Sequence, residues 1–493
     1  MIYNSTRGAR IGARSAEAIK TGLCPDGGLF MPERIPTLND GEIRRLSALS
    51  YHERAAAILG KFLTDYTEEE LLADAGAAYA EDKFGREPAP ISALSDNRFL
   101  LELYHGPTCA FKDMALQIMP RLFARALKKT NEKRTALILV ATSGDTGKAA
   151  LEGYRDVPGT AIQVFYPADG VSRTQKLQMQ TQGGENVSVY GIRGNFDDAQ
   201  NGVKRIFADE KTREALDRNG VFLSSANSIN WGRLVPQIVY YVSACCDLLA
   251  RGAIAPGEAI DVCVPTGNFG NIFAAFLAKK MGLPIGRLVC ASNENNVLTE
   301  FLETGVYDRN RPFRTTMSPS MDILISSNLE RLLYVVCGPE KTARCMAALA
   351  KEGRYRVSPE AFREIGRHFA GYCASEEETA DVLRRTYEKD SRLVDPHTAV
   401  ALAAAEKYRE KEKSPRALLV ASTASPYKFA GDVYRSLTGV AAEESSLPAV
   451  LAGLTGEPVP APIAALGERA VRFSEVIGKE QMDQAVRKFA ENR

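Results

Sequence analysis

One lysine in this sequence lies where local structure would make it reactive. Lys112 belongs to the stretch HGPTCAFKD, residues 105–113. Residues 98–104, RFLLELY, have the apolar composition of a short strand, and the spacing over 111–127 predicts a helix. The first turn of a helix presents N–H groups that attract anions. Burial lowers the pKa of a lysine amine, which suits it to Schiff-base chemistry with an aldehyde.

Two polar, glycine-rich loops follow other predicted strands. The first, 142–147, comes after a strand expected over 136–141, and the second, 267–271, comes after a strand expected over 259–264 and before a helix expected over 271–281. Glycine lets a backbone approach a ligand closely, and successive N–H groups bind anions. In an open α/β sheet such loops meet at the carboxyl ends of the strands. Together with the lysine they predict one binding site.

Nucleotide-binding motifs do not account for these loops. The stretch GDTGK resembles the end of a P-loop, which needs a glycine five positions before Gly147 and a serine or threonine after Lys148. This chain has Thr142 and Ala149 at those positions. The second loop lacks the glycine spacing of a dinucleotide fingerprint. An NTPase or a dinucleotide enzyme is therefore disfavoured.

A Schiff-base lysine beside an anion cradle fits pyridoxal 5′-phosphate (PLP), whose aldehyde takes the lysine and whose phosphate takes a helix start. The ring nitrogen of this cofactor needs a partner. A strand expected over 416–421 leads to Ser422, Thr423 and Ser425, and one of these hydroxyls could face that nitrogen. An ordinary Ser/Thr-rich loop is the alternative.

Composition is that of a soluble globular protein, with 45% hydrophobic and 25% charged residues in 493. The net charge of +1 gives no reason to expect nucleic acid or an anionic membrane as a partner. Nine scattered cysteines form no CxxC pair, and the four histidines do not cluster. We therefore expect reduced thiols, a cytoplasmic protein and no metal site.

The order of predicted elements indicates an α/β fold with largely parallel sheets, because apolar strands alternate with helices. We expect a helical accessory domain over 1–95. A larger PLP-binding α/β domain is expected over 96–134 and 246–493. A smaller α/β domain over 135–245 would carry the loop 142–147.

The chain resembles the threonine synthases, PLP enzymes of the tryptophan-synthase-β-like fold (fold type II), from end to end. Its long N-terminal segment is similar to the branch that includes the yeast enzyme. The residues that carry the resemblance are YNSTRG (3–8), GLCPDGGLFMPE (22–33), HGPTCAFKD (105–113), TSGDTG (142–147), VSRTQKLQMQTQGGENV (171–187), GNFDDAQ (194–200), SANSINWGR (225–233), PTGNFGN (265–271), SPSMDI (318–323), DPHTAV (395–400) and TASPYKF (423–429).

The resemblance implies a role for each matching residue. Lys112 would be the catalytic Schiff-base lysine, and Thr423 would face the ring nitrogen. The residues implied for the cofactor phosphate are Gly267, Asn268, Phe269, Gly270 and Asn271. Those implied for the substrate carboxylate are Ser143, Gly144, Asp145, Thr146 and Gly147. Those implied for the substrate phosphate are Ser228, Asn230 and Arg233.

Two positions depart from the family pattern. Many relatives have asparagine where this chain has Asp145, and a carboxylate near the phenolate-like ring oxygen would be repelled unless it were protonated or turned aside. Its contact is therefore left open. Many relatives have histidine where this chain has Ser425, to which we assign no role.

The implied reaction converts O-phospho-L-homoserine and water to L-threonine and phosphate, by γ-elimination and β-addition of water, in a monomer or homodimer. Two alternatives stay open. One is a threonine or serine dehydratase of the same fold, whose hydroxyl substrate needs no phosphate site. The other is a homologue that binds PLP or phosphate without turnover, against which the retention of Lys112 argues.

Overall fold

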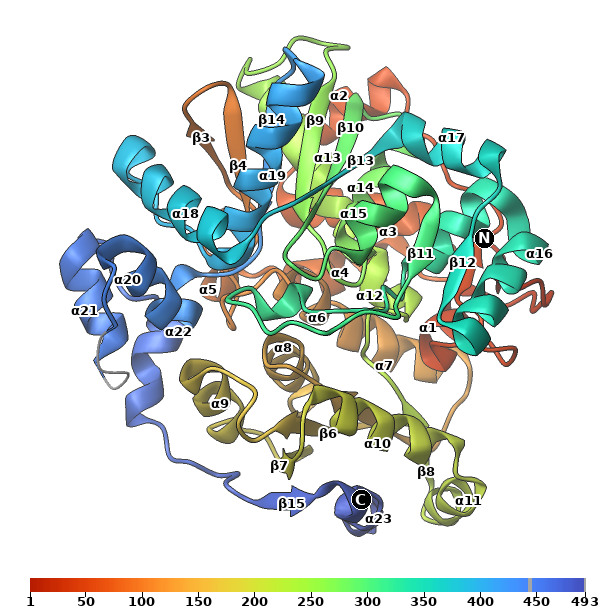
Figure 1. Ribbon diagram of the computed structural model, residues 1–493. Helices are drawn as coiled ribbons and strands as arrows, with labels where there is room; N and C mark the ends of the chain where they lie inside the picture. The colour runs from red at the N-terminus through yellow and green to blue at the C-terminus, as the bar shows by residue number, and fades with distance from the viewer. Residues whose placement is uncertain (442–445, 492–493) are drawn as a thin grey trace.

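A six-stranded sheet, the larger of two sheets with more than two strands, organises most of the chain in this computed structural model, which describes residues 1–441 and 446–491. Six strands lie in the order β13-β10-β9-β14-β4-β3, all parallel except the edge hairpin β3–β4. Figure 1 shows this sheet in the upper half of the molecule. Its strands are β3 (Ile91–Leu94), β4 (Arg98–Glu102), β9 (Ile260–Pro265), β10 (Ile285–Ser292), β13 (Phe369–Cys373) and β14 (Leu418–Ser422).

Helices cover both faces of this sheet, which explains why its central strands read as continuous apolar runs. In β9, Val262 and Val264 belong to the core cluster that contains α13 (Pro236–Ala250) and α14 (Gly270–Lys280), whereas Cys263 belongs to the cluster that contains α19 (Pro396–Glu412). Alternation along the strand thus places the two cores on opposite faces. The other elements around the sheet are α15 (Val297–Thr304), β11 (Val306–Asp308), η1 (Pro319–Met321), α16 (Leu329–Glu352), β12 (Arg354–Arg356), α17 (Pro359–His368) and α18 (Glu376–Asp390).

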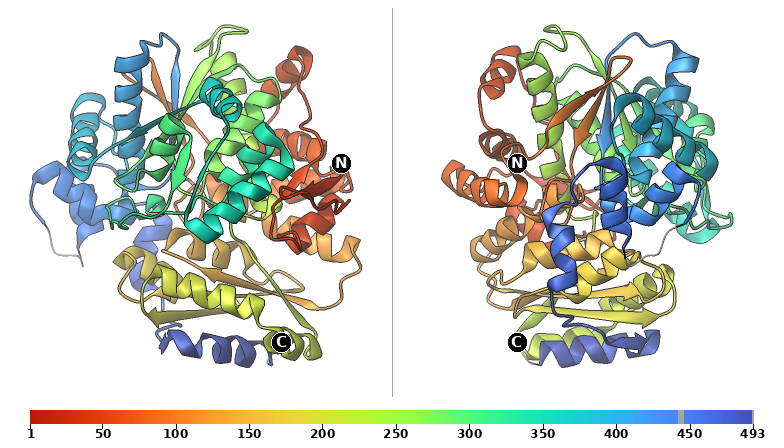
Figure 2. Two further views of the ribbon diagram at one scale, coloured as in Figure 1. Left: turned by 45° about the vertical axis from the view of Figure 1, so that its right-hand side comes forward. Right: turned by 90° about the vertical axis from the view of Figure 1, so that its left-hand side faces the viewer.

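The smaller sheet is wholly parallel, in the order β15-β7-β6-β5-β8. Helices α8 and α9 lie between it and the larger sheet, and α10 and α23 pack on its other face (Figures 1 and 2). The elements are β5 (Thr135–Ala141), α8 (Asp145–Tyr154), β6 (Thr160–Pro167), α9 (Arg173–Gln180), β7 (Val187–Arg193), α10 (Phe196–Ala208), α11 (Glu210–Arg218), β8 (Val221–Ser224), β15 (Val476–Gly478) and α23 (Met482–Ala490).

The N-terminal segment shares its core with the larger sheet. Trp231, at the start of α12 (Trp231–Leu234), lies between Tyr3 and Phe62, with ring centroids 5.6 and 5.7 Å away. The segment is helical as expected, except for the antiparallel strand pair β1–β2 on either side of α1, which the helical prediction missed. Its elements are β1 (Tyr3–Ser5), α1 (Ser15–Thr21), β2 (Phe30–Pro32), α2 (Asp40–Ser47), α3 (Tyr51–Phe62), α4 (Glu68–Ala78) and α5 (Glu81–Phe84).

The structure corrects the expected division of the chain at three points. The boundary at residue 95 falls inside the β3–β4 hairpin. Helices α12 and α13, expected mostly with the smaller sheet, pack on the N-terminal helices and α14. The end of the chain, expected with the larger sheet, pairs β15 with β7 of the smaller one. It reaches that sheet through η2 (Pro426–Phe429), α20 (Ala430–Thr438), α21 (Leu447–Thr455), α22 (Ala461–Ala464) and η3 (Ala465–Glu468), and η4 (Lys479–Gln481) follows β15.

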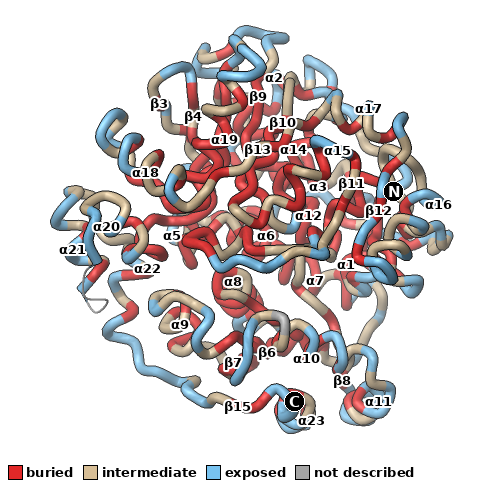
Figure 3. The backbone as a smooth tube through the Cα atoms, in the orientation of Figure 1, coloured by how far each residue is buried: buried red, intermediate tan, exposed pale blue. Residues whose placement is uncertain are grey.

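The helix expected over 111–127 is broken into α6 (Asp113–Leu116) and α7 (Met119–Lys129). Pro120 is the cause, because it has no N–H to donate and its ring crowds the preceding turn. The other predicted strands and helices appear with ends shifted by a few residues at most. Figure 3 shows α6, α12, α14 and the larger sheet buried, and exposed faces on α18, α21 and α23. Within the described residues, no helix is long and apolar enough to cross a membrane.

Candidate active site

The segment before α6 is held rigidly, and this fixes Lys112. Asp113 accepts hydrogen bonds from the Thr108 N–H at 2.8 Å and from its hydroxyl at 2.6 Å. The Phe111 N–H donates to the carbonyl of Thr423 at 2.8 Å, which ties the segment to the loop after β14. Lys112 is 8% exposed. The lysine therefore sits at the start of a helix with a fixed backbone, as its sequence context predicts.

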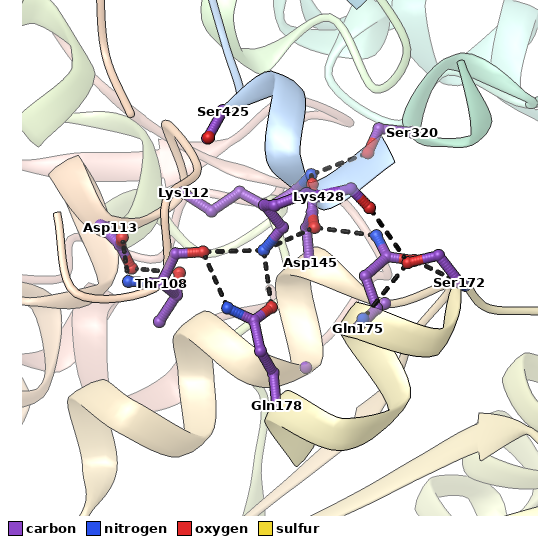
Figure 4. Close-up of polar contacts among 12 residues, drawn as sticks. Thr108, Lys112, Asp113, Asp145, Ser172, Gln175, Gln178, Ser320, Ser425 and Lys428 are labelled. Atoms are coloured by element: carbon purple, nitrogen blue, oxygen red, sulfur yellow. Dashed lines mark hydrogen bonds and ion pairs between the residues drawn. The ribbon is translucent and has the colours of Figure 1, made fainter. Parts of the chain in front are cut away.

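The Lys112 amine lies among charged groups. Its Nζ donates to the Ser320 hydroxyl at 3.0 Å and is 3.5 Å from Asp145 Oδ2 (Figure 4). Burial lowers the pKa of Lys112, and the positive charges of Arg233 and Lys428 act in the same direction, against the opposing effect of Asp145. A lowered pKa increases the fraction of free amine, which is the nucleophilic and basic form.

Asp145, whose contact the sequence left open, is held by two lysines. Its Oδ1 is 3.0 Å from Lys428 Nζ and accepts from Gln175 Nε2 at 2.8 Å. Burial alone would raise the pKa of Asp145, but Lys428 and Lys112 outweigh burial and hold that pKa below its ordinary value. The carboxylate is thus ionised and turned toward the lysines. This is the second of the two arrangements that the sequence allowed.

Lys428 is a residue of the site that sequence reasoning missed. Its ammonium is buried and donates to the Thr108 carbonyl at 2.7 Å and to Gln178 Oε1 at 2.9 Å, besides pairing with Asp145. Gln178 is in α9, so this ammonium joins the loop after β14 to the smaller sheet's helices (Figure 4). The lysine is part of TASPYKF, yet only the fold brings it to Asp145.

The loop 142–147 curves round the start of α8. Gly144 has φ 130°, and a Cβ there would lie 2.4 Å from the Gln175 side chain, so only glycine fits. The Thr142 hydroxyl accepts from the N–H groups of Gly144 and Gly147 at 2.9 and 2.8 Å. The N–H groups of Asp145 and Thr146, which begin α8, have no acceptor within the helix. They suit a carboxylate or another anion.

The loop between β9 and α14 is shaped as an anion cradle. The carbonyls of Gly267 and Asn268 accept hydrogen bonds from Ser326 Oγ and from Asn328, at 2.7–3.1 Å. A Cβ on Gly267 would lie 2.6 Å from the Ser320 carbonyl oxygen. Phe269 has φ 61°, a left-handed conformation that persists in non-glycine residues mainly where surrounding structure demands it.

Asn271 supplies an unpaired donor to this cradle. The hydroxyls of Tyr240 and Tyr241 both donate to Asn271 Oδ1. Its Nδ2 is buried and has no hydrogen-bond partner among the described residues. Buried polar groups are almost always paired, so an amide fixed in this way indicates a ligand acceptor. The donor set of the loop therefore fits the phosphate of PLP.

Thr423 and Ser425 follow β14 but differ in their surroundings. The Ser425 hydroxyl accepts a hydrogen bond from the Tyr427 N–H and caps the start of η2. Its role is therefore local and structural. The side chain of Thr423 is 5% exposed, and its hydroxyl makes no hydrogen bond within the described part of the chain. Thr423 is therefore the available hydroxyl, as the resemblance implies for the ring nitrogen.

Arg233 is a buried cation without a carboxylate partner in the described residues. Its Nη1 donates to the Ala226 carbonyl at 2.9 Å. Burial lowers the pKa of Arg233 to about 10. The cost of burying an unpaired charge is large, so such an arginine indicates an anionic ligand. Phosphate suits the planar guanidinium best because the two form bidentate hydrogen bonds.

Ser228 and Asn230 lie on the same loop and differ in their roles. Ser228 Oγ is 3.3 Å from Ser327 Oγ, which donates to Asn268 Oδ1, so Ser228 faces the phosphate cradle. The Asn230 amide accepts from the Gly232 N–H and donates to the carbonyls of Ile19 and Ser225. Its hydrogen-bonding groups are committed to the backbone. The structure therefore assigns Asn230 to the shape of the loop and not to substrate.

Nine cysteines are free, and in the described ranges no group of three or more His, Cys, Asp or Glu side chains could hold a metal. Burial raises the pKa of the Cys109 thiol to about 12, so this neighbour of the lysine is an inert thiol.

Comparison with known proteins agrees with this geometry. Residues 89–423 match the family described as pyridoxal-phosphate dependent enzyme, residues 2–79 the threonine synthase N terminus, and residues 398–486 the threonine synthase C-terminal family.

Individual relatives match over most of this chain. Threonine synthase from Pseudomonas aeruginosa is 38% identical over 460 residues, covering 92% of this chain and 93% of the relative. The crystal structure of the yeast enzyme superposes with a TM-score of 0.89 at 32% identity and covers 100% and 99% of the two chains. Human threonine synthase-like 1 is 41% identical over 434 residues, but the chain spans only 58% of its length. The chain belongs to the threonine synthase family of pyridoxal-phosphate-dependent enzymes.

Proposed function

We propose that this protein is a threonine synthase, which converts O-phospho-L-homoserine and water to L-threonine and phosphate with PLP as cofactor. The observation that carries the proposal is Arg233, buried and without a carboxylate partner among the described residues, close enough to Lys112 for its charge to lower the lysine's pKa. A phosphorylated substrate explains this cation, whereas a hydroxyl substrate does not.

The cofactor is held by three groups in this proposal. Lys112 takes its aldehyde, the loop 267–271 takes its phosphate with Asn271 Nδ2 as a further donor, and the Thr423 hydroxyl faces its ring nitrogen. When bound, PLP withdraws electrons from the substrate carbon that carries the amino group, which makes its proton removable.

Lys112 handles protons in the proposed reaction. The reaction removes protons from the α and β carbons, expels phosphate from the γ carbon and adds water at the β carbon. Because burial lowers the pKa of Lys112, its Nζ is available as the base that takes the α proton and returns it at the end. Asp145, 3.5 Å away, stabilises the ammonium formed at Nζ after each proton uptake.

The anionic groups of the substrate match the remaining donors. Arg233 with Ser228 binds the phosphate and stabilises the negative charge that it carries away. In the loop from Ser143 to Gly147, the N–H groups of Asp145 and Thr146 at the start of α8 bind the substrate carboxylate, while those of Gly144 and Gly147 donate to the Thr142 hydroxyl and hold the loop's shape. Asp145 itself faces the lysines, so its side chain does not repel the carboxylate or the cofactor's ring oxygen.

The proposed partner is this small substrate alone, with a monomer or homodimer as the assembly, no nucleic acid or membrane partner and a cytoplasmic location. The net charge of +1 and the nine unpaired thiols support these expectations.

The purified, PLP-loaded protein tests the proposal. We expect phosphate and threonine to appear in equal amounts from O-phospho-L-homoserine. Ammonia and a keto acid from serine or threonine, without phosphate release, would instead identify a dehydratase. A protein that binds PLP and turns over none of these substrates would be a non-catalytic homologue.

A further inference from the structure

Ser320, in η1, makes two contacts that the proposed reaction does not yet explain. Its hydroxyl accepts from Lys112 Nζ at 3.0 Å, and its N–H donates to His397 Nε2 at 3.1 Å. Figure 4 shows the serine facing the lysine from the side opposite Thr108. The contact with Nζ is shorter than the 3.5 Å that separates Nζ from Asp145 Oδ2. Among the described residues, Ser320 thus makes the shorter of the two polar contacts with the reacting amine.

His397 is fixed as a hydrogen-bond acceptor toward this serine. A histidine nitrogen that accepts a hydrogen bond carries no proton, so the ring's proton is on Nδ1. Nδ1 lies 2.6 Å from Asp395 Oδ2, and the same carboxylate caps α19 by accepting from the N–H groups of His397 and Thr398. His397 is 2% exposed and Asp395 is 0% exposed. The aspartate therefore sets the tautomer that the serine needs.

A second set of hydrogen bonds holds residues 316–322, the segment that contains Ser320. The Asp322 carboxylate accepts from the N–H and the hydroxyl of Thr316, at 3.0 and 2.7 Å. It also accepts from the side-chain amides of Asn293 and Asn295, at 2.8 and 3.0 Å. Both asparagines follow β10 directly. The serine is thereby anchored to the sheet as well as to α19.

The same serine borders the phosphate cradle. Its carbonyl oxygen approaches Gly267 so closely that a Cβ there would lie 2.6 Å away. Ser320 therefore touches the amine through its side chain and the cradle through its backbone. Any displacement of η1 would change both ends of the site together.

We propose that Ser320 holds the free amine of Lys112 in place, and that Asp395 and His397 are positioning residues that act through it. The inference rests on the proposed role of Lys112 as the reacting amine. A free lysine side chain is long and flexible, so an amine that must leave and return to one carbon benefits from an anchor. Asp145 supplies charge, and Ser320 supplies the hydrogen bond.

The test compares Ser320→Ala, His397→Gln and His397→Leu with the wild-type full-length protein. The first readout is the rate at which protein stripped of cofactor captures PLP, followed by absorbance as a function of pH. Capture needs the free amine, so its midpoint reports the amine's titration. The charged groups that face the amine are Asp145, Lys428 and Arg233, and none of them is altered in these variants.

In Ser320→Ala the ammonium loses an acceptor, so we expect the capture midpoint to fall by about 0.5–1 pH unit. We expect kcat to fall about tenfold with KM within twofold, because substrate binding is untouched while the amine is misplaced. His397→Gln keeps an acceptor for the Ser320 N–H and should stay within threefold of wild type. His397→Leu, which removes that acceptor, should behave like Ser320→Ala.

Ser318→Ala is the matched control. Ser318 lies in the same segment, 316–322, and its hydroxyl accepts a hydrogen bond from the Asn293 side-chain amide. It does not contact the lysine. It should lower the melting temperature without moving the capture midpoint. An unchanged midpoint and kcat in Ser320→Ala, or an equal shift in Ser318→Ala, would overturn the inference. Capture does not depend on the substrate, so a wild-type protein inactive on O-phospho-L-homoserine would refute the proposed function and leave this test valid.

Discussion

Replacing Arg233 with methionine should separate activity from stability. The guanidinium is buried, and within the described residues it hydrogen-bonds only the Ala226 carbonyl, so its other donors are available to a ligand. Two charge-assisted hydrogen bonds to phosphate contribute about 3–6 kcal/mol to binding. If they are formed in the transition state, their loss lowers kcat/KM by about 10²–10⁴-fold.

The thermal stability of Arg233→Met should equal that of the wild type or exceed it, although the activity of this variant falls. Burial lowers the Arg233 pKa to about 10, so near neutral pH the guanidinium is charged and its burial opposes folding. Methionine removes that cost and loses one hydrogen bond to a carbonyl, about 1 kcal/mol. We expect a melting temperature equal to that of the wild type or higher, as is common where a functional residue is removed.

Arg331 provides the contrast. This arginine is also buried, but the protein itself satisfies it through the carbonyls of Phe30 and Ile229 and the side chain of Asn328. Arg331→Met should therefore lower the melting temperature clearly. Steady-state assays with O-phospho-L-homoserine and thermal unfolding of both variants decide the matter. A kcat/KM for Arg233→Met within fivefold of wild type would refute the assignment of this residue to the substrate phosphate.

Three further predictions concern the rest of the site. Lys112→Ala should abolish turnover and the visible absorbance of the PLP-loaded protein, and a coloured or active variant would exclude the Schiff-base role. Gly267→Ala places a Cβ 2.6 Å from the Ser320 carbonyl oxygen, so PLP affinity, measured by equilibrium titration, should fall at least tenfold; unchanged affinity would contradict the close packing. Lys428→Met leaves Asp145 with less compensation and should cost about 3–5 kcal/mol, whereas Lys428→Met combined with Asp145→Asn should recover part of this in thermal unfolding. Purely additive effects of the two single substitutions on thermal unfolding would show that Lys428 and Asp145 are not coupled. The lysines hold the Asp145 pKa below its ordinary value, so the ion pair of Lys428 and Asp145 stabilises the fold above about pH 4. This contribution is lost on acidification.

The local sequence was sufficient to predict those parts of the site that lie within a single segment of the chain. The stretch around Lys112 and the two glycine-rich loops combine strand, turn and helix signals within about twenty residues. The structure places each of them at the carboxyl end of a strand, as predicted. Glycines at positions such as Gly144, with φ 130°, can be read from sequence because no other residue type adopts that backbone easily.

What the sequence could not give depends on contacts between distant segments. Lys428 reaches Asp145 across more than 280 positions of sequence, and Ser320 reaches Lys112 across 208. The β15 strand has three residues, too few for a periodic signal, and only its pairing with β7 shows which sheet it joins. The break before α7 had a local signal in Pro120, which the helical spacing around it obscured.

The charges of the site explain why an aspartate is acceptable at position 145. Lys428 and Arg233 contribute two buried cations beside Lys112, and Asp145 is the carboxylate among the described residues that pairs with both lysines. The excess of positive charge matches a ligand set with a cofactor phosphate, a substrate phosphate and a carboxylate. An asparagine at this position would leave the buried Lys428 ammonium with neutral oxygen partners only, among them the Thr108 carbonyl and Gln178 Oε1. The aspartate and Lys428 therefore form a unit, and a relative with asparagine at this position should lack a buried lysine opposite it.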